Sequence, residues 1–162
     1  MPAVSHRKTV RALALGLAVS LAPAVALAEE GPYDKHIAAR QSQMKLLAWN
    51  ISKLGGMAKG AIPYDAEKAA AAAANLKAVA HLDLRDAWPE GSDSFSFDQT
   101  KALPKIWENM EDFGKKFMDM QAAADAMAEA AGQGPDQLKA ALGKLGGACK
   151  ACHKEYRKPK DG

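Results

Sequence analysis

The sequence predicts an all-α protein: an antiparallel four-helix bundle with one longer crossover loop between the second and third helices. Three observations lead to this prediction. Apolar residues recur at alternating steps of three and four along four segments, which is the pattern of helices packed nearly antiparallel. Proline and glycine mark the boundaries of these segments, and none of them has a convincing strand pattern. The chain contains only two cysteines, so its fold depends on an apolar core rather than on disulfides.

The N-terminal residues 1–28 have the pattern of a secretory signal peptide. A basic start precedes an apolar run from Ala12 to Leu27, and the stretch ends in the small-x-small pattern at which signal peptidase cleaves. The run is shorter than the roughly 20 apolar residues that span a bilayer, and a polar segment follows it directly. We therefore expect cleavage after Ala28, export to a bacterial periplasm, no membrane insertion of the mature protein, and a single domain at residues 29–162.

The charge balance changes when the signal peptide is removed. The whole chain has 22 Lys and Arg against 19 Asp and Glu, but three of the cations (Arg7, Lys8 and Arg11) belong to the signal peptide. The mature chain therefore carries equal numbers of the two signs. The excess of cations in the precursor gives no support for nucleic acid as a partner.

The first helix is expected to begin near Pro32 and to carry its apolar seam from Ile37 to Ala58, and the second is expected from Ala66 to about Leu82. Pro32 is expected in the first turn of the first helix, and a Gly-Ala-Ile-Pro stretch at 60–63 separates the two helices. Asp65 is expected to cap the second helix, whose alanines favour helix and allow close packing. The apolar seams consist of Ile37, Met44, Leu47, Ile51, Leu54 and Ala58 in the first helix, and of Ala69, Ala73, Leu76 and Ala80 in the second.

The long connection at about residues 83–103 is rich in Ser, Asp, Gly and Phe. A loop of this length in a compact domain is usually functional or crosses the bundle. A third helix is expected to follow with an unbroken seam, and a Gly-Gln-Gly stretch at 132–134 separates it from a fourth helix with Pro135 in its first turn. The seams consist of Ile106, Met110, Phe113, Phe117, Met120, Ala124 and Met127 in the third helix, and of Leu138, Leu142, Leu145, Cys149, Cys152 and Tyr156 in the fourth.

Cys149, Cys152 and His153 form a C-x-x-C-H motif on the fourth helix. Two thiols three residues apart on one helical face can each add across a vinyl group of a haem, and the next histidine then reaches the iron. A zinc site would need more ligands, whereas His36 and His81 lie far away on other segments. A thioredoxin-like dithiol belongs at a helix N-terminus after a strand, where the helix dipole lowers the thiol pKa. The motif therefore predicts covalent attachment of one haem c per chain.

Four stretches of the mature chain together resemble the bacterial cytochromes c′. They are ARQSQMK at 39–45, KGAIPYD at 59–65, PKIWENMEDFG at 104–114 and CKACHKEYR at 149–157. The resemblance implies a homodimer that pairs the first two helices, one haem c on the last helix, and high-spin iron with histidine on one side only. It also implies binding of NO and CO, with a role in NO handling or in electron transfer to a periplasmic redox partner.

Carried over to this sequence, the resemblance assigns the proximal side of the haem to the fourth helix. Cys149 and Cys152 match the cysteines that form thioether bonds, and His153 matches the axial iron ligand. Arg157 matches an arginine near the proximal face, and its position one turn after His153 is compatible with that contact.

The resemblance assigns the other haem neighbours to the first helix and the crossover loop. Arg40 and Gln41 match residues beside the haem and its propionates, Thr100 lies in the loop near the haem, and Met44 matches the residue over the distal face. The pair Arg40 and Gln41 resembles the five-coordinate members, so we expect Met44 to be unligated.

Low-spin relatives with the same fold ligate the iron through a methionine at the position of Met44. The alternative is therefore a six-coordinate electron carrier in which the thioether of Met44 is the sixth ligand and raises the reduction potential. A peroxidase would need a distal side chain that transfers protons, and methionine cannot do so. We therefore expect a haem-binding or electron-transfer protein rather than an enzyme.

Overall fold

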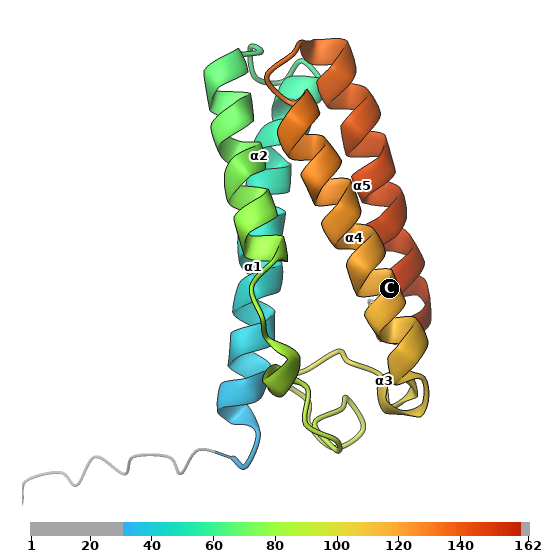
Figure 1. The fold of residues 1–162 in the computed structure, drawn as a ribbon. Coiled ribbons are helices and arrows are strands. Elements are labelled where there is room, and N and C mark those ends of the chain that lie inside the picture. The colour runs from blue at the N-terminus through green and yellow to red at the C-terminus, as the bar shows by residue number, and fades with distance from the viewer. Residues whose placement is uncertain (1–30, 160–162) are drawn as a thin grey trace, which may run out of the picture.

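The computed structural model describes residues 31–159, so the expected signal peptide and its cleavage site lie outside the described residues. The long helices are α1 (Asp34–Ala58), α2 (Ala66–Ala80), α4 (Met110–Ala130) and α5 (Pro135–Tyr156), and the short ones are the 3₁₀-helix η1 (Arg85–Ala87) and α3 (Lys105–Glu108). Over this range the only β-type pairing is an isolated bridge. The predicted all-α bundle is confirmed (Figure 1). No helix of the described range is long and apolar enough to cross a membrane.

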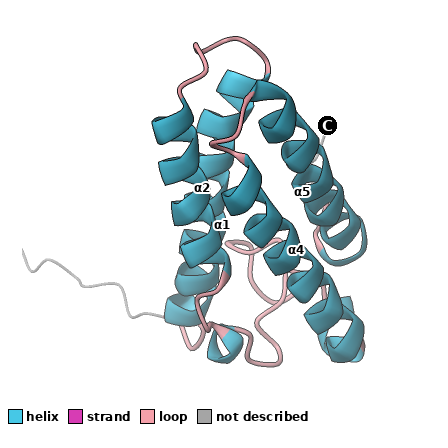
Figure 2. Cartoon of the chain, turned by 45° about the horizontal axis from the view of Figure 1, so that its top comes forward, coloured by secondary structure: helices cyan, strands magenta, loops and turns pink. Residues whose placement is uncertain are grey.

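The four long helices form a closed ring of neighbours. α1 contacts α2, α2 contacts α4, α4 contacts α5, and α5 returns to α1. Short loops at 59–65 and 131–134 join antiparallel neighbours at one end of the bundle, whereas residues 81–104 cross from α2 toward α3 and α4 at the other (Figures 1 and 2). The predicted crossover between the second and third long helices is therefore confirmed.

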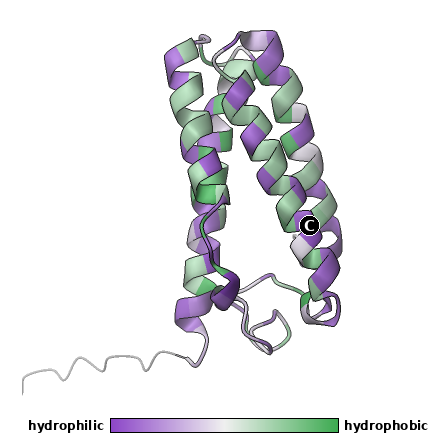
Figure 3. Ribbon diagram, viewed as in Figure 1, coloured by the Kyte–Doolittle hydropathy of each residue, from purple (hydrophilic) through white to green (hydrophobic). Residues whose placement is uncertain are grey.

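The largest apolar cluster, called the main core below, runs between the four long helices. Apolar and polar residues alternate around each of these helices, as expected where one face is buried (Figure 3). Each fully buried leucine in such a core contributes about 1.5–3 kcal/mol to stability. The main core consists of Leu47, Leu54, Met57, Ala69, Ala72, Ala73, Leu76, Ala80, Met120, Ala124, Met127, Ala131, Leu138, Ala141 and Leu145.

A smaller cluster, called the loop-end cluster below, lies where the crossover loop meets the end of α5. Its aromatic rings meet edge to face, with the centroid of Phe113 4.8 Å from that of Trp88 and 5.4 Å from that of Tyr156. Such pairs contribute about 0.5–1.5 kcal/mol beyond the area that they bury. The cluster consists of Ile106, Phe113 and Tyr156, with Trp88, Ala102, Trp107 and Cys152 packed against them.

Two of the three predicted helix-start residues are confirmed. The side chain of Asp65 accepts a hydrogen bond from Lys68 N at 3.0 Å and caps α2, and Pro135 occupies the first turn of α5. Pro32 is not in the first turn of α1, because that helix begins at Asp34. The carboxylate of Asp34 accepts a hydrogen bond from Gly31 N at 2.7 Å and so folds the preceding residues into a turn.

The prediction of an unbroken third helix is wrong. Asn109, with φ −142° and ψ 48°, separates α3 from α4, and its carbonyl accepts the hydrogen bond from Phe113 N that starts α4. Its side chain donates to Lys105 O at 3.2 Å, so the amide competes with the helical backbone. As a result Met110, predicted to lie in the seam, is 47% exposed.

The C-terminal end of α2 is held by side chains from both of its neighbours. Gln43 of α1 donates to Val79 O at 2.9 Å, and Gln121 of α4 donates to Ala80 O at 3.0 Å. These carbonyls are among the last of the helix and have no partner within it. The two glutamines therefore fix the point at which the chain leaves the bundle for the crossover loop.

Candidate functional site

The two cysteines lie on the inward side of the last turns of α5. Both are half-buried and unpaired; Cys149 packs against the main core, whereas Cys152 packs against the loop-end cluster. Burial raises the pKa of both thiols. A redox dithiol needs the opposite shift, so these thiols are suited to a fixed bond with an apolar group rather than to thiol–disulfide exchange.

His153 follows directly on the same helical turn and is exposed. Partial desolvation of its imidazole and, to a smaller extent, the positive charge of Arg157 lower the pKa of His153. A lower pKa favours the neutral imidazole, which is the form that binds a metal ion. The structure therefore places the predicted iron ligand beside both predicted attachment residues.

Arg157 lies just past the end of α5 and has an extended backbone, with φ −118° and ψ 129°. Its N–H donates to His153 O at 3.2 Å, which continues the hydrogen bonding of the helix by one residue. Its side chain is exposed, and its charge reaches the imidazole of His153. The predicted proximity of these two residues is thus compatible with the structure, although Arg157 is no longer helical.

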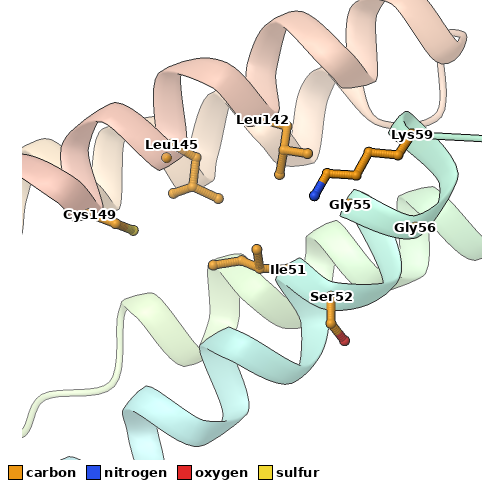
Figure 4. A pocket seen from close by; sticks show the side chains of 9 residues that line it. Ile51, Ser52, Gly55, Gly56, Lys59, Leu142, Leu145 and Cys149 are labelled. Atoms are coloured by element: carbon orange, nitrogen blue, oxygen red, sulfur yellow. The ribbon is translucent and has the colours of Figure 1, made fainter. Parts of the chain in front are cut away.

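A groove of about 530 Å³ between α1 and α5 begins at Cys149. The thiol of Cys149 marks one end, Ile51 and Leu145 line the walls, and Lys59 marks the other end (Figure 4). Its volume falls within the roughly 300–1,000 Å³ typical of ligand and cofactor pockets. Cys149 therefore borders a largely apolar groove that extends away from the rest of the motif, since neither Cys152 nor His153 is among its lining residues.

Met44 on α1 is half-buried and packs against the main core, as Cys149 of α5 and Phe117 of α4 do. α1 and α5 are neighbours in the ring. Met44 and Cys149 thus pack against the same main core from neighbouring helices.

Arg40 is 2% exposed and holds the crossover loop. Its guanidinium donates to Ala87 O at 3.2 Å, to Ser92 Oγ at 2.7 Å and to Thr100 Oγ1 at 3.0 Å, and it lies 4.7 Å from the ring centre of Trp88. Burial lowers the pKa of Arg40 to about 10, while the Asp93 carboxylate acts in the opposite direction. The guanidinium stays charged at neutral pH and donates its hydrogen bonds to the crossover loop.

The structure brings together three predicted site residues at this point. Thr100 is a direct partner of Arg40, and the side chain of Gln41 donates to Gln99 O in the same loop. The ring of Trp88, on which Arg40 lies, contacts Phe113 in the loop-end cluster that also receives Cys152. The arginine network thus adjoins the Cys152 side of the attachment motif through two aromatic rings.

Sequence reasoning did not find the residues that support this arrangement. Trp88 and Ser92 belong to a loop without periodicity, so no pattern marks them as partners of Arg40. Tyr156 was expected only as a seam residue, but its O–H donates to Asp112 Oδ2 at 2.6 Å. Burial, and then this hydrogen bond, raise the pKa of Tyr156 to about 12. Cys152 and Tyr156 are four residues apart and so lie on one face of the helix. This spacing was the available sequence signal that Tyr156 lies beside the attachment motif.

Comparison with known proteins identifies the family. The family model described as Cytochrome C′ matches residues 35–157. The chain belongs to the cytochrome c′ family. Cytochrome c-554 from Cereibacter sphaeroides is 42% identical over 89% of this chain and 95% of its own length. Cytochrome c′ from the same organism is 34% identical over 91% of this chain and 98% of its own.

Solved structures of the cytochrome c′ family share the fold. A cytochrome c′ from Rhodobacter sphaeroides superposes with a TM-score of 0.77 at 35% identity, covering 80% of this chain and all of that one. A cytochrome c′ with ligand-controlled dimer dissociation has a TM-score of 0.72 at 31% identity, covering 82% of this chain and all of its own. A nitric oxide complex of a mutant cytochrome c prime from Alcaligenes xylosoxidans has a TM-score of 0.70 at 32% identity, with the same coverage.

Membership of the cytochrome c′ family identifies the cofactor as covalently bound haem c. The family consists of periplasmic haem proteins that bind ligands or transfer electrons, and not of typical enzymes. The inward-facing, uncharged thiols and the adjacent histidine of this chain fit such a group.

Proposed function

We propose that the mature chain, residues 29–162, is exported to the periplasm and holds one haem c through thioether bonds to Cys149 and Cys152, with His153 as the axial iron ligand. The observation that carries this proposal is the position of the two half-buried thiols, one against the main core and one against the loop-end cluster, on the turns that also carry His153. A group bonded to both thiols lies where the two apolar clusters meet. When bound, it supplies an iron that takes a diatomic ligand or an electron.

Attachment is tested on the purified holoprotein in acidified acetone. Haem held by two thioethers stays with the protein, whereas haem held only by His153 and by apolar contacts is extracted. Replacing both cysteines by serine should make the haem extractable. Complete extraction of haem from the unchanged protein would contradict covalent attachment.

The iron is proposed to be five-coordinate and high-spin, so that the protein binds NO and CO and serves in NO handling or in electron exchange with a redox partner. Met44 is half-buried and packs against the apolar main core. Its three rotatable bonds let the thioether move aside for a diatomic ligand at modest cost. A solved relative in the same family was obtained as its nitric oxide complex, which supports this assignment.

A six-coordinate electron carrier with Met44 as sixth ligand is the second candidate. The observation in its favour is that Met44 on α1 packs against the same main core as Cys149 on the neighbouring helix α5. The relative with 42% identity is named cytochrome c-554, whereas a cytochrome c′ from the same organism has 34% identity. Because the chain is similar to relatives with both names, the six-coordinate electron carrier is kept as a second candidate.

Absorption spectra of the ferric and ferrous holoprotein separate the two candidates. For the five-coordinate protein we expect high-spin spectra, and replacing Met44 with Ala should make CO bind faster and more tightly with no change of spin state. Met44→Leu keeps the volume without the sulfur and serves as the control. A low-spin wild type that Met44→Ala converts to high-spin, with a fall in reduction potential, would establish the electron carrier instead.

The protein is also proposed to be a homodimer that pairs α1 and α2 with those of its copy. Leu46 and Trp49, three residues apart on the outer face of α1, are 47% and 63% exposed, and exposed apolar pairs of this kind are common at interfaces. Replacing Leu46 with Glu should convert the dimer to a monomer in sedimentation experiments at micromolar concentration. A wild type that sediments as a monomer would contradict this part of the proposal.

A further inference from the structure

Phe95 is 81% exposed, although the loop that carries it is firmly held. Asp93, only 8% exposed, accepts hydrogen bonds at its Oδ1 from Phe95 N at 2.8 Å and from Ser96 N at 3.2 Å. Ser94 N donates to Ala102 O at 2.7 Å and joins the two arms of the loop. The phenyl ring is therefore presented to solvent on an ordered backbone, and little backbone entropy remains to be lost when a partner binds it.

The arms of this loop also pair with the residues that follow α5. Ala102 forms an antiparallel bridge with Arg157, and Lys158 N donates to Lys101 O at 2.8 Å. Since Ser94 pairs with Ala102, Phe95 lies near Lys101 and therefore near Lys158. The crossover loop and the last turns of α5 thus lie toward the same end of the bundle (Figure 1).

Lysines without an ion-pair partner gather at the same end. The members of this group, called the lysine rim below, are exposed, and none has a carboxylate oxygen within 4.0 Å in the described part of the chain: Lys101, Lys150, Lys154 and Lys158. The nearby carboxylate of Glu155 is bound by Lys105 at 2.6 Å. The last turns of α5 and the residues after them are therefore locally positive, whereas the loop that carries Phe95 has more carboxylates than cations (Asp83, Asp86, Glu90, Asp93 and Asp98 against Arg85 and Lys101).

Helix stability explains only part of the lysine rim. Cations in the last turn of a helix interact favourably with its dipole, which accounts for Lys154. Lys150 and Lys154 are four residues apart, however, and like charges at that spacing weaken a helix by a few tenths of a kcal/mol. Lys101 and Lys158 lie outside any helix. The arrangement is thus better suited to binding a negative surface than to supporting α5.

We propose that Phe95 and the lysine rim form the docking surface for an acidic redox protein. Protein interfaces place an aromatic anchor inside a polar rim, and opposite charges steer the partners together and fix their orientation. Asp98 is exposed at the tip of the same loop, midway in sequence between Phe95 and Lys101, and the ring of the preceding Phe97 packs against Tyr33, just before α1. The acidic patch of the partner therefore meets the α5 side of Phe95.

This proposal rests on the redox role included in the proposed function, because electron exchange needs the haem close to the docked protein. His153 lies between Lys150 and Lys154 in sequence and is exposed on the same turns of α5. A haem whose iron is bound by His153 is then adjacent to the lysine rim. Docking at this end gives electrons a short route between the iron and the partner protein.

The test uses the holoprotein on gold electrodes coated with mixed layers of carboxylate- and methyl-terminated thiols, which imitate an acidic surface with apolar patches. A microbalance measures the adsorbed mass, and voltammetry measures the haem signal. The variants are Phe95→Ala and the double change Lys150→Gln with Lys154→Gln. The matched control is Lys139→Gln with Lys144→Gln, which removes the same charge from the same helix about 15 Å away along its axis.

We expect the Lys150 and Lys154 variant to adsorb several-fold more weakly than the wild type at low salt and equally at about 0.5 M salt, where charges are screened within a few ångströms. Phe95→Ala should adsorb more weakly on mixed layers only, and the control like the wild type. Equal adsorption of both double variants would overturn the docking surface. If adsorption depends on Phe95 and the lysine rim but voltammetry gives no haem signal, the docking surface is supported and the redox role is contradicted.

Discussion

The main core consists of Leu, Ala and Met side chains from four long helices, whereas the loop-end cluster combines aromatic rings with a buried arginine beside it. Apolar packing holds most of the first region, because its helices satisfy most of their own backbone groups. A few polar contacts assist it, such as those of Gln43, Gln121 and Tyr64 with carbonyls near the helix ends. The second region must fix a long loop, whose backbone groups need outside partners. Arg40 supplies several of these partners. The difference shows that the conformation of the end with the C-x-x-C-H motif depends on specific polar contacts rather than on buried area.

The largest expected effect comes from a cavity in the main core. Leu76 is fully buried, and replacing it with Ala should lower the free energy of unfolding by about 2–5 kcal/mol. The absorption spectrum of the haem should change little, because Leu76 lies on α2, which carries none of the predicted haem-site residues. Denaturant unfolding and spectra of the same samples check both statements.

The control for this change is Leu82→Ala, since Leu82 is 48% exposed and its loss should alter stability by less than about 0.5 kcal/mol. A clear change in the haem spectrum of Leu76→Ala, together with the loss of unfolding free energy, would show that the two regions are not separate.

A smaller effect on global unfolding is expected when Arg40 is replaced with Met, which keeps most of the aliphatic part of the side chain but none of its donors. Hydrogen bonds from a charged group contribute about 1.5–3 kcal/mol, and most of the loss should appear as loosening of residues 83–103 rather than of the bundle. Limited proteolysis and amide hydrogen exchange should locate the change in the loop. Faster exchange throughout α2 and α4 instead would mean that Arg40 supports the main core.

The smallest effect is expected from two matched tyrosine changes. Tyr156→Phe removes the hydrogen bond to Asp112 in the loop-end cluster, and Tyr64→Phe removes one to Ala131 O at 3.0 Å beside the main core. Each should cost about 1 kcal/mol. Only Tyr156→Phe should alter the haem spectrum, because Tyr156 and Cys152 pack in the same cluster.

The pH dependence of Tyr156→Phe gives a second readout. The pKa of Tyr156 is raised to about 12, so its contribution is complete below the unfolded value near 10 and is lost as pH rises from there to about 12. The same hydrogen bond lowers the pKa of Asp112, so that carboxylate stabilises the fold above its unfolded pKa and ceases to do so as pH falls through its folded value. The variant should therefore differ most from the wild type at neutral pH, and an equal difference at all pH values would contradict this account.

The bundle, its crossover and the attachment motif could be predicted because each has a signal within a few residues of sequence. The seam of α4 and the spacing of Cys149 and Cys152 are such signals. The break at Asn109 could not be predicted, because the apolar spacing from Ile106 to Phe113 continues across it and a single asparagine is a weak signal. The partners of Arg40 could not be predicted either, since Ala87, Ser92 and Thr100 come from a loop whose conformation depends on the arginine that it surrounds.

The pairing between the crossover loop and the end of α5 has a consequence for the order of folding. The bond from Leu103 N to Tyr156 O and the bridge between Ala102 and Arg157 join segments separated by the whole of α4 and α5. Contacts between distant segments form later than those across short loops, because more chain entropy must be lost first. We therefore expect the helices to pair before this end of the molecule closes. The turns of α5 with Cys149 and Cys152 then stay open longest, which leaves time for a large cofactor to enter.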